Sequence, residues 1–181
     1  MTSVTGGGRS RRVGLLGGTF DPPHIGHLAA AVSVRHALGL HEVRLVPNGD
    51  PWQKRGLRPI TPAPLRLAMV RAAVQDLAGV VVSDAEVLRD GPSYTIDTLE
   101  AVRATEPDVE PVVVLGRDAA ALIDTWHRCR DVLAVADVAV VDRGDDTPMP
   151  PALTGATVHR VAMPRLDVSS SDLRRRVGAG E

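Results

Sequence analysis

Several residue types that mark particular classes of protein are scarce in this sequence. A single cysteine, Cys129, excludes an internal disulfide and a multi-thiolate metal site, and it favours a reducing compartment. Aromatic side chains are limited to two Trp, one Tyr and one Phe. The 21 basic and 22 acidic residues nearly cancel, so no overall charge attracts nucleic acid or an anionic membrane. We therefore expect a small ligand and no nucleic-acid partner.

Long hydrophobic runs are absent as well. Apolar segments such as residues 109–115 are far shorter than the ~20 residues that span a bilayer, and no apolar signal region follows the basic N-terminal residues. We expect no membrane association and a cytoplasmic location. Residues 1–12 are rich in Gly, Ser, Thr and Arg and can bury little, which predicts a flexible leader. A 44% hydrophobic content suffices for one compact domain over residues 13–181.

Apolar strand patterns alternate with helical patterns along that domain. The expected strands cover residues 13–16, 42–46, 80–82, 111–115, 136–141 and 157–162. The expected helices cover residues 26–38, 64–77, 94–104, 119–134 with a break near Trp126, and 170–177. In the second of these helices we expect one apolar face made of Leu65, Ala68, Met69, Ala72 and Ala73. Residues 142–157 form the longest expected loop.

Strands that alternate with helices predict an α/β fold, a Rossmann-like doubly wound parallel sheet. Each right-handed crossover lays its helix back on the sheet, so both faces become covered. Ligands of such folds bind at the carboxyl ends of the strands. We therefore look for chemistry where the expected strands end.

The first such place is the junction after the first strand. Gly17 and Gly18 allow a tight turn and a close approach to a ligand, and the helix that follows offers free N–H groups to a phosphate. His24 and His27 are three residues apart, so both imidazoles can face one space, and Gly26 between them leaves room for phosphate. An ordinary glycine turn with two incidental surface histidines is the simpler interpretation, but it does not explain why all these residues share one junction.

A second anion site is indicated near the C-terminus. A cluster of Ser169, Ser170 and Ser171 can cap the last helix and offer hydroxyl and N–H groups to phosphate, and Arg174 adds charge one turn along. Taken alone, this segment is an ordinary serine N-cap followed by a basic tail. Its pairing with the first junction favours a triphosphate clamp.

Two motifs at these places resemble one superfamily. Gly18-Thr19-Phe20-Asp21-Pro22 with His24-Ile25-Gly26-His27 resembles the signature of the HxGH nucleotidylyltransferases, and Val168-Ser169-Ser170-Ser171-Asp172-Leu173-Arg174 resembles their ISSTxxR motif. The resemblance implies a three-layer α/β/α nucleotidylyltransferase fold. Class I aminoacyl-tRNA synthetases share the first signature, but they are much longer and carry a KMSKS-type loop and tRNA-binding domains.

The segments between the motifs are similar to the nicotinate mononucleotide adenylyltransferases, and the similarity runs from Val13 to Arg176. It is carried by residues 47–54, by residues 91–99 and by Gly116-Arg117-Asp118 followed by Trp126. Phosphopantetheine adenylyltransferase and glycerol-phosphate-type cytidylyltransferases share the first motif but would not explain Pro92-Ser93-Tyr94-Thr95 or Trp126. The implied reaction joins ATP to nicotinate mononucleotide, giving nicotinate adenine dinucleotide and pyrophosphate in NAD biosynthesis.

The resemblance also implies roles for individual residues. The implied catalytic residues are His24, His27, Lys54 and Arg174. The implied ATP-binding residues are Gly17, Gly18, Thr19, Phe20, Gly26, Gly116, Asp118, Ser170 and Ser171. The implied mononucleotide-binding residues are Asn48, Ser93, Tyr94, Thr95, Trp126 and Arg143. No side-chain cluster has the spacing of a metal site, so Mg²⁺ is expected to arrive on ATP.

Structural interpretations of these residues stay open. Ser93 and Asp118 could cap helices, Trp126 could be a core aromatic residue, and Trp52 could cover a lid rather than touch substrate. Ser171 stands where a threonine is usual, residues 142–145 replace a usual Ser-Arg-Pro-Gly, and the chain stops at Glu181 although members of the family usually continue further.

Three alternatives to the implied function follow from these departures. They are adenylyl transfer to nicotinamide mononucleotide, transfer to another phosphorylated substrate of a specialised pathway, and a non-catalytic nucleotide-binding subunit. A homo-oligomer is left open.

Overall fold

Six parallel strands form one sheet in the computed structural model, which describes residues 11–54, 56, 58–142 and 148–181. The strand order is β3-β2-β1-β4-β5-β6. The strands are β1 (Arg11–Gly18), β2 (Glu42–Pro47), β3 (Val80–Val82), β4 (Val109–Gly116), β5 (Asp137–Asp142) and β6 (Val158–Ala162). Every strand pair is parallel, and the order is that of a doubly wound Rossmann sheet. The predicted fold class is confirmed.

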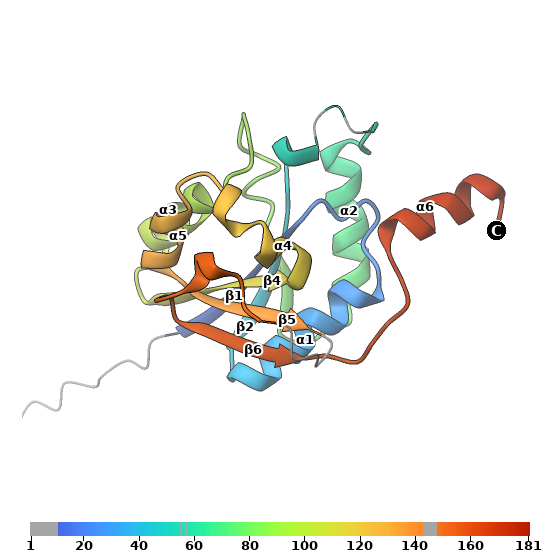
Figure 1. The fold of residues 1–181 in the computed structure, drawn as a ribbon. Coiled ribbons are helices and arrows are strands. Elements are labelled where there is room, and N and C mark those ends of the chain that lie inside the picture. Colours follow the sequence, from blue (N-terminus) through green and yellow to red (C-terminus); the bar gives the residue numbers. More distant parts are fainter. Residues whose placement is uncertain (1–10, 55, 57, 143–147) are drawn as a thin grey trace, which may run out of the picture.

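Helices cover both faces of the sheet, which gives the expected three layers (Figure 1). The longer helices are α1 (Ile25–Leu38), α2 (Ala63–Val74), α3 (Thr95–Thr105) and α6 (Ser170–Ala179). The shorter ones are α4 (Arg117–Ala121), α5 (Cys129–Val135) and the 3₁₀ turns η1 (Trp52–Lys54), η2 (Ile123–Thr125) and η3 (Pro151–Leu153). One face packs against α1 and α2, and the other packs against α3, α4 and α5. Over the described residues, no helix is long and apolar enough to cross a membrane.

The central strands are apolar on both faces because both faces are covered. In β4, Val112 and Val114 pack with the α1 and α2 side, and Val113 and Leu115 pack with the opposite side. All four are 4% exposed or less. A strand buried on both faces has a continuous apolar run rather than an alternating one, which is why the sequence pattern identified it.

Strand β1 begins two residues earlier than predicted. Arg11 and Arg12 belong to the strand, the side chain of Arg11 pairs with Glu106, and Arg12 lies 3.1 Å from the carboxylate of Asp137. The prediction missed these two residues because it relied on apolar side chains, and the strand begins with two arginines. The rest of the expected leader, residues 1–10, lies outside the described residues.

The buried face of α2 differs from the predicted one. Leu65 is 57% exposed, whereas the buried side chains are Arg66, Leu67, Val70 and Val74. A prediction from the positions of apolar residues places an arginine in solvent. Here Arg66 is buried because backbone carbonyls from three loops accept its hydrogen bonds.

The region predicted as one interrupted helix, residues 119–134, is divided into α4, η2 and α5. The segment between η2 and α5 holds Trp126 and ends at Arg128, whose φ of 52° is left-handed. The predicted break near Trp126 is confirmed.

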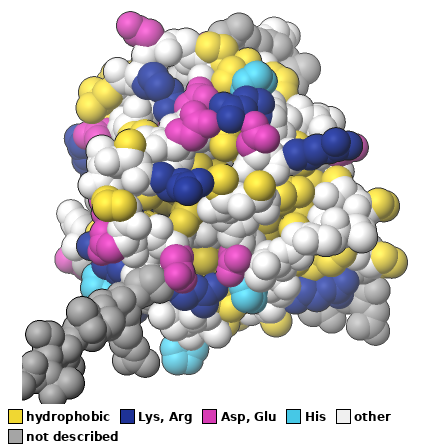
Figure 2. Space-filling model, turned by 90° about the vertical axis from the view of Figure 1, so that its left-hand side faces the viewer, with side chains coloured by type: hydrophobic (Ala, Val, Ile, Leu, Met, Phe, Trp, Pro, Cys, Tyr) yellow, Lys and Arg dark blue, Asp and Glu magenta, His cyan; other side chains and the backbone are white. Residues whose placement is uncertain are grey.

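Charges of both signs are mixed over the surface that Figure 2 shows, where acidic and basic side chains lie next to one another rather than forming a field of one sign. Three crossovers, through α1 and α2 on one side of the sheet and through α3 on the other, separate the neighbouring strands β1 and β4 in sequence. Their carboxyl ends, at Gly18 and Gly116, therefore form the switch point at which such folds bind ligands.

Candidate active site

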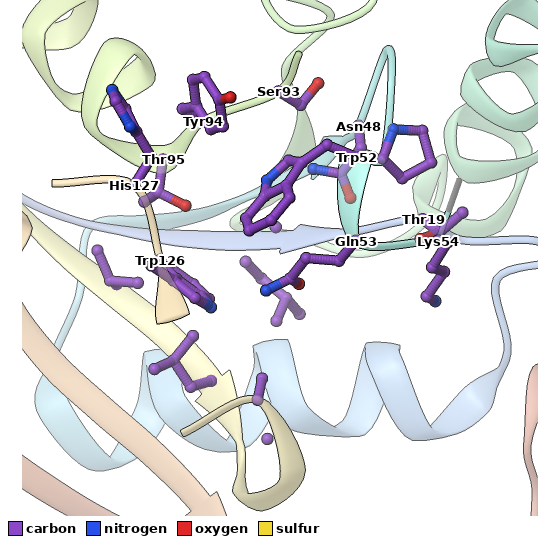
Figure 3. Close-up of a pocket in the computed structure, with 18 of the residues that line it drawn as sticks. Thr19, Asn48, Trp52, Gln53, Lys54, Ser93, Tyr94, Thr95, Trp126 and His127 are labelled. Atoms are coloured by element: carbon purple, nitrogen blue, oxygen red, sulfur yellow. The ribbon is translucent and has the colours of Figure 1, made fainter. Parts of the chain in front are cut away.

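A cavity of about 250 Å³ opens at this switch point. We call it the aromatic cavity. Figure 3 shows its labelled side chains, with Tyr94 and His127 on one side and Thr19 and Lys54 on the other. Its lining comes from the ends of β1 and β4, from η1, and from the start of α3: Leu16, Gly17, Gly18, Thr19, Asn48, Pro51, Trp52, Gln53, Lys54, Ser93, Tyr94, Thr95, Val113, Val114, Leu115, Gly116, Ala119, Trp126 and His127.

A second cavity, of about 440 Å³, adjoins the first. We call it the cationic cavity. It is lined by Gly18, Thr19, Phe20, Asp21, His27, Lys54, Arg58, Ser169, Ser170, Ser171 and Arg174. Three of these residues, Gly18, Thr19 and Lys54, also line the aromatic cavity, so the two spaces meet there.

The two histidines of the first motif stack at the start of α1. Their ring centroids are 3.7 Å apart, and Phe20 and His27 form a T-shaped pair with centroids 4.9 Å apart. His24 is the N-cap residue, and its backbone N–H donates to Nδ1 of His27 at 3.1 Å. One ring nitrogen of His27 is thus committed to the helix N-terminus, which fixes the orientation of the ring.

This hydrogen bond determines which nitrogen of His27 can act as a donor. Burial, with smaller contributions from His24 and Lys54, lowers the pKa of His27 to about 3, so the ring is neutral at neutral pH. A neutral imidazole that accepts at Nδ1 carries its proton on Nε2. His27 therefore brings a neutral N–H donor to the cationic cavity. Burial also lowers the pKa of His24, whose Nδ1 is buried without a hydrogen-bond partner.

Gly26 is required by the position of His24. A Cβ at residue 26 would lie 3.0 Å from Nδ1 of His24 and 3.6 Å from a methyl group of Val168. A side chain there would push the His24 ring away from its stack with His27. The glycine of the motif is therefore explained by the packing of the imidazole itself.

The second motif docks on the first although about 150 residues separate them in sequence. The hydroxyl of Ser169 accepts from the N–H of Asp172 at 3.1 Å and so caps α6, as the serine pattern predicted. Ser170 donates to the carbonyl of Pro22 at 2.8 Å, and Arg174 donates to the carbonyl of Asp21 at 2.6 Å. These bonds hold the start of α6 against the loop before α1 (Figure 1).

Positive charge predominates in the cationic cavity. Its lining has three cations, Lys54, Arg58 and Arg174, and one carboxylate, Asp21, which pairs with Arg58 at 2.5 Å. Burial raises the pKa of Asp21, but hydrogen bonds from Thr61 and the Arg58 pair outweigh it and lower the pKa. Partial desolvation and the neighbouring cations Arg58 and Arg174 lower the pKa of Lys54. This excess of cations favours an anion.

Four aromatic rings line the aromatic cavity: Trp52, Tyr94, Trp126 and His127. Tyr94 stacks on His127 with centroids 4.3 Å apart, and Trp52 and Tyr94 form a T-shaped pair with centroids 5.8 Å apart. In Figure 3 the Trp52 indole projects into the cavity, and Trp126 lies across from it. Trp126 also packs partly against the core. Flat surfaces of this kind suit a planar ring as ligand.

A buried carboxylate supports the polar edge of the aromatic cavity. Glu86 is 4% exposed and accepts from the side-chain amide of Asn48 at 2.9 Å and from the hydroxyl of Thr98 at 2.7 Å. The hydroxyl of Ser93 accepts from the backbone N–H groups of Gly49 at 2.9 Å and Asp50 at 3.3 Å. Ser93 therefore holds the loop after β2, and it does not cap α3, whose N-cap is Tyr94.

Most of the residues predicted for the site line the two cavities. The exceptions among the described residues, which line neither cavity, are His24, Gly26 and Asp118, the last of which is exposed in the first turn of α4. Arg143 lies outside the described residues. Lining residues to which the sequence analysis assigned no role include Gln53, Arg58 and His127. Gln53 stands inside the segment 47–54 that carries the resemblance, whereas Arg58 and His127 had no local signal, because tertiary packing brings them to the cavities.

The described residues around these cavities form no dedicated metal site. Within the described ranges, no group of three or more His, Cys, Asp or Glu side chains could hold a metal ion. The donors present are mainly cations and neutral N–H and hydroxyl groups, which suit phosphate oxygens rather than a cation.

Comparison with known proteins agrees with this geometry. Residues 15–176 match the cytidylyltransferase-like family. A probable nicotinate-nucleotide adenylyltransferase of Albidiferax ferrireducens is 40% identical over 93% of this chain and 87% of its own length. One from Symbiobacterium thermophilum is 43% identical over 93% and 85%.

Solved structures share the fold. The nicotinic acid mononucleotide adenylyltransferase of Plasmodium falciparum, complexed with NaAD, superposes with a TM-score of 0.76 at 19% identity, covering 91% of this chain and 83% of its own. A putative nicotinate-nucleotide adenylyltransferase from Vibrio parahaemolyticus has a TM-score of 0.65 at 20% identity and covers 94% and 89%. With two motifs assembled at the switch point and relatives of this kind over nearly its whole length, the chain belongs to the nicotinate-nucleotide adenylyltransferases of the cytidylyltransferase-like family.

Proposed function

We propose that this enzyme transfers the adenylyl group of ATP to nicotinate mononucleotide. A phosphate oxygen of the mononucleotide attacks the α-phosphorus of ATP, the bond from that phosphorus to the bridging oxygen of the β-phosphate breaks, and pyrophosphate leaves. The products are nicotinate adenine dinucleotide and pyrophosphate. The names of the relatives support this assignment of substrates.

The junction of the two cavities is the observation that carries the proposal. A triphosphate needs a cationic space, and a pyridine ring needs aromatic surfaces; here the two spaces adjoin and share Gly18, Thr19 and Lys54. With ATP phosphates in the cationic cavity and the mononucleotide in the aromatic cavity, the reacting phosphates meet at the shared residues. Such a reaction depends mainly on positioning and on charge stabilisation.

Each side of the junction then has a chemical role. His27 donates its Nε2–H to an oxygen of the α-phosphate, and Lys54 and Arg174 neutralise the triphosphate and the leaving pyrophosphate. We propose that His24, which stacks on His27 at the start of α1, also stabilises the charge on these phosphates. We further propose as ATP-binding residues Gly17, Gly18, Thr19, Phe20, Gly26, Gly116, Asp118, Ser170 and Ser171.

The aromatic cavity takes the acceptor. We propose Asn48, Ser93, Tyr94, Thr95 and Trp126 as its mononucleotide-binding residues, with Arg143 as a further phosphate contact. ATP enters as its Mg²⁺ complex, whose metal is held by the nucleotide phosphates, because no carboxylate cluster among the described residues is available for it.

The same cavity accounts for a preference for the acid. Tyr94 is the N-cap of α3 and Thr95 its first residue, so free backbone N–H groups and the positive end of the helix dipole face the cavity edge. A carboxylate accepts from such donors, whereas a carboxamide turns its own NH₂ toward at least one of them. We expect catalytic efficiency with nicotinate mononucleotide to exceed that with nicotinamide mononucleotide by roughly ten- to a hundredfold.

Pyrophosphate release tests the proposal directly. The purified protein is incubated with Mg·ATP and each of the two mononucleotides, with Mg·CTP replacing ATP as the control nucleotide, and the dinucleotide is identified by mass. We expect pyrophosphate and nicotinate adenine dinucleotide from ATP and the acid. Binding of both substrates without any product would instead support a non-catalytic nucleotide-binding subunit.

A further inference from the structure

Arg66 is the most deeply buried charged side chain of the described chain, with 1% exposure. Its three guanidinium nitrogens each donate to a backbone carbonyl: Nη1 to Thr19 at 2.7 Å, Nη2 to Gly49 at 3.1 Å, and Nε to Thr61 at 2.8 Å. Burying a cation costs several kcal/mol, and a residue that breaks a folding rule often serves a site. Arg66 therefore needs an explanation beyond packing.

The three acceptors belong to different parts of the active site. Thr19 follows β1 and lines both cavities. Gly49 lies in the loop after β2, next to Asn48 of the aromatic cavity, and its N–H donates to the hydroxyl of Ser93. Thr61 lies two residues before the start of α2 and hydrogen-bonds the carboxylate of Asp21 in the cationic cavity. One side chain thus bonds the backbone on the ATP side and on the acceptor side at once.

The loop at Gly49 has little freedom to find another position. A Cβ at this glycine would lie 2.1 Å from the carbonyl oxygen of Glu86, so the two backbones are in close contact. The N–H of Asn48 donates to the carbonyl of Gly18 at 2.9 Å, which is a second link between the loops after β1 and β2. Arg66 adds a third link between these loops, because its planar guanidinium donates to the carbonyls of Thr19 and Gly49 with a fixed geometry.

We propose that Arg66 is a positioning residue, which sets the distance between the ATP-binding loop at Thr19 and the acceptor-binding loop at Gly49 and so aligns the two reacting phosphates. The proposal rests on the proposed adenylyl transfer. An in-line displacement is sensitive to such alignment, and a misplacement of about 1 Å can cost about a hundredfold in rate. Because neither loop loses its own ligand contacts when Arg66 changes, the effect falls on kcat rather than on KM.

Two substitutions and a matched control test this role. Arg66→Lys keeps the charge, but its single ammonium group cannot donate to three carbonyls that three separate nitrogens reach in the wild type. Arg66→Met removes the charge and all three hydrogen bonds. We expect kcat to fall about tenfold in the first and about a hundredfold in the second, with each KM within about threefold of wild type. Arg71→Lys and Arg71→Met, on the exposed side of the same helix, are the controls, since Arg71 pairs with Asp84 away from both cavities.

Hydrogen–deuterium exchange gives a readout that does not require turnover. Arg66→Lys should raise exchange in peptides covering residues 17–20 and 48–51, while residues 137–142 of β5, which β4 separates from β1, stay as protected as in wild type. Unchanged kcat and exchange in Arg66→Lys would overturn the proposal, as would a loss that appears only in KM or only in melting temperature. If wild-type protein releases no pyrophosphate, the proposed function fails, and the exchange result alone still decides whether Arg66 positions the two loops.

Discussion

Substitutions of His27 should separate its catalytic nitrogen from its structural one. Nδ1 accepts from the His24 N–H at 3.1 Å, and Nε2 is left as the donor. Asparagine places an acceptor near the Nδ1 position but falls short of Nε2, and glutamine reaches toward Nε2 but cannot bond the N-cap in the same way. His27→Asn and His27→Gln therefore remove one function each, and His27→Ala removes both.

The expected magnitudes differ for activity and for stability. Loss of one preorganised donor to a developing charge costs about 2.7–4 kcal/mol, so kcat should fall about 10²- to 10³-fold in His27→Asn and His27→Ala, but only about tenfold in His27→Gln. Loss of a capping acceptor costs about 0.5–2 kcal/mol. His27→Ala and His27→Gln should therefore melt at a lower temperature than His27→Asn, by about 2–4 °C for each kcal/mol lost.

The assay is pyrophosphate release under saturating Mg·ATP and nicotinate mononucleotide, with ATP affinity measured separately by calorimetry. His27→Asn and His27→Gln should rank in opposite orders for activity and for stability, whereas His27→Ala should be low in both. Turnover within about threefold of wild type in His27→Asn would refute the role of Nε2. If activity and melting temperature fell together across all three variants, the loss would be structural.

Three further predictions concern the same site. Because the pKa of His27 is lowered to about 3 in the folded protein, well below its ordinary value of 6.5, the unfolded chain binds the extra proton; the free energy of unfolding should therefore fall as pH drops from 6.5 towards 3. Urea denaturation at pH 7 and pH 5 should show a larger loss in wild type than in His27→Asn, and equal losses would contradict this. Ser169→Ala removes the cap of α6, worth about 1 kcal/mol, and should raise the KM for ATP about fivefold without changing that for the mononucleotide. Gly26→Ala should displace His24 and lower kcat about tenfold, whereas Gly178→Ala, where a Cβ meets nothing within 4 Å, should be neutral in activity.

The elements that the sequence predicted well are those with a local cause. A run such as Val112 to Leu115 is apolar because both faces of its strand are buried, and Ser169 caps a helix through a hydrogen bond three residues away. Such patterns are complete within a few residues. They also located the first and second motifs, whose residue types already indicated phosphate binding.

The parts that were missed depend on distant partners. Arg66 is buried because carbonyls at residues 19, 49 and 61 converge on it, and Arg58 lines the cationic cavity because Asp21 holds it. Ser93 was assigned to ligand or helix cap, yet its hydroxyl accepts from a loop more than forty residues away. No local periodicity contains such information.

The placement of the two indole rings has a spectroscopic consequence. The chain contains two tryptophans, Trp52 and Trp126, and both line the aromatic cavity. Indole emission is sensitive to the polarity of its surroundings and to a stacked ring, so the intrinsic fluorescence of this protein reports on that cavity without a background from tryptophans elsewhere. A titration with mononucleotide alone can therefore follow acceptor binding in unlabelled protein, and comparing Trp52→Phe with Trp126→Phe assigns the signal to one wall of the cavity or the other.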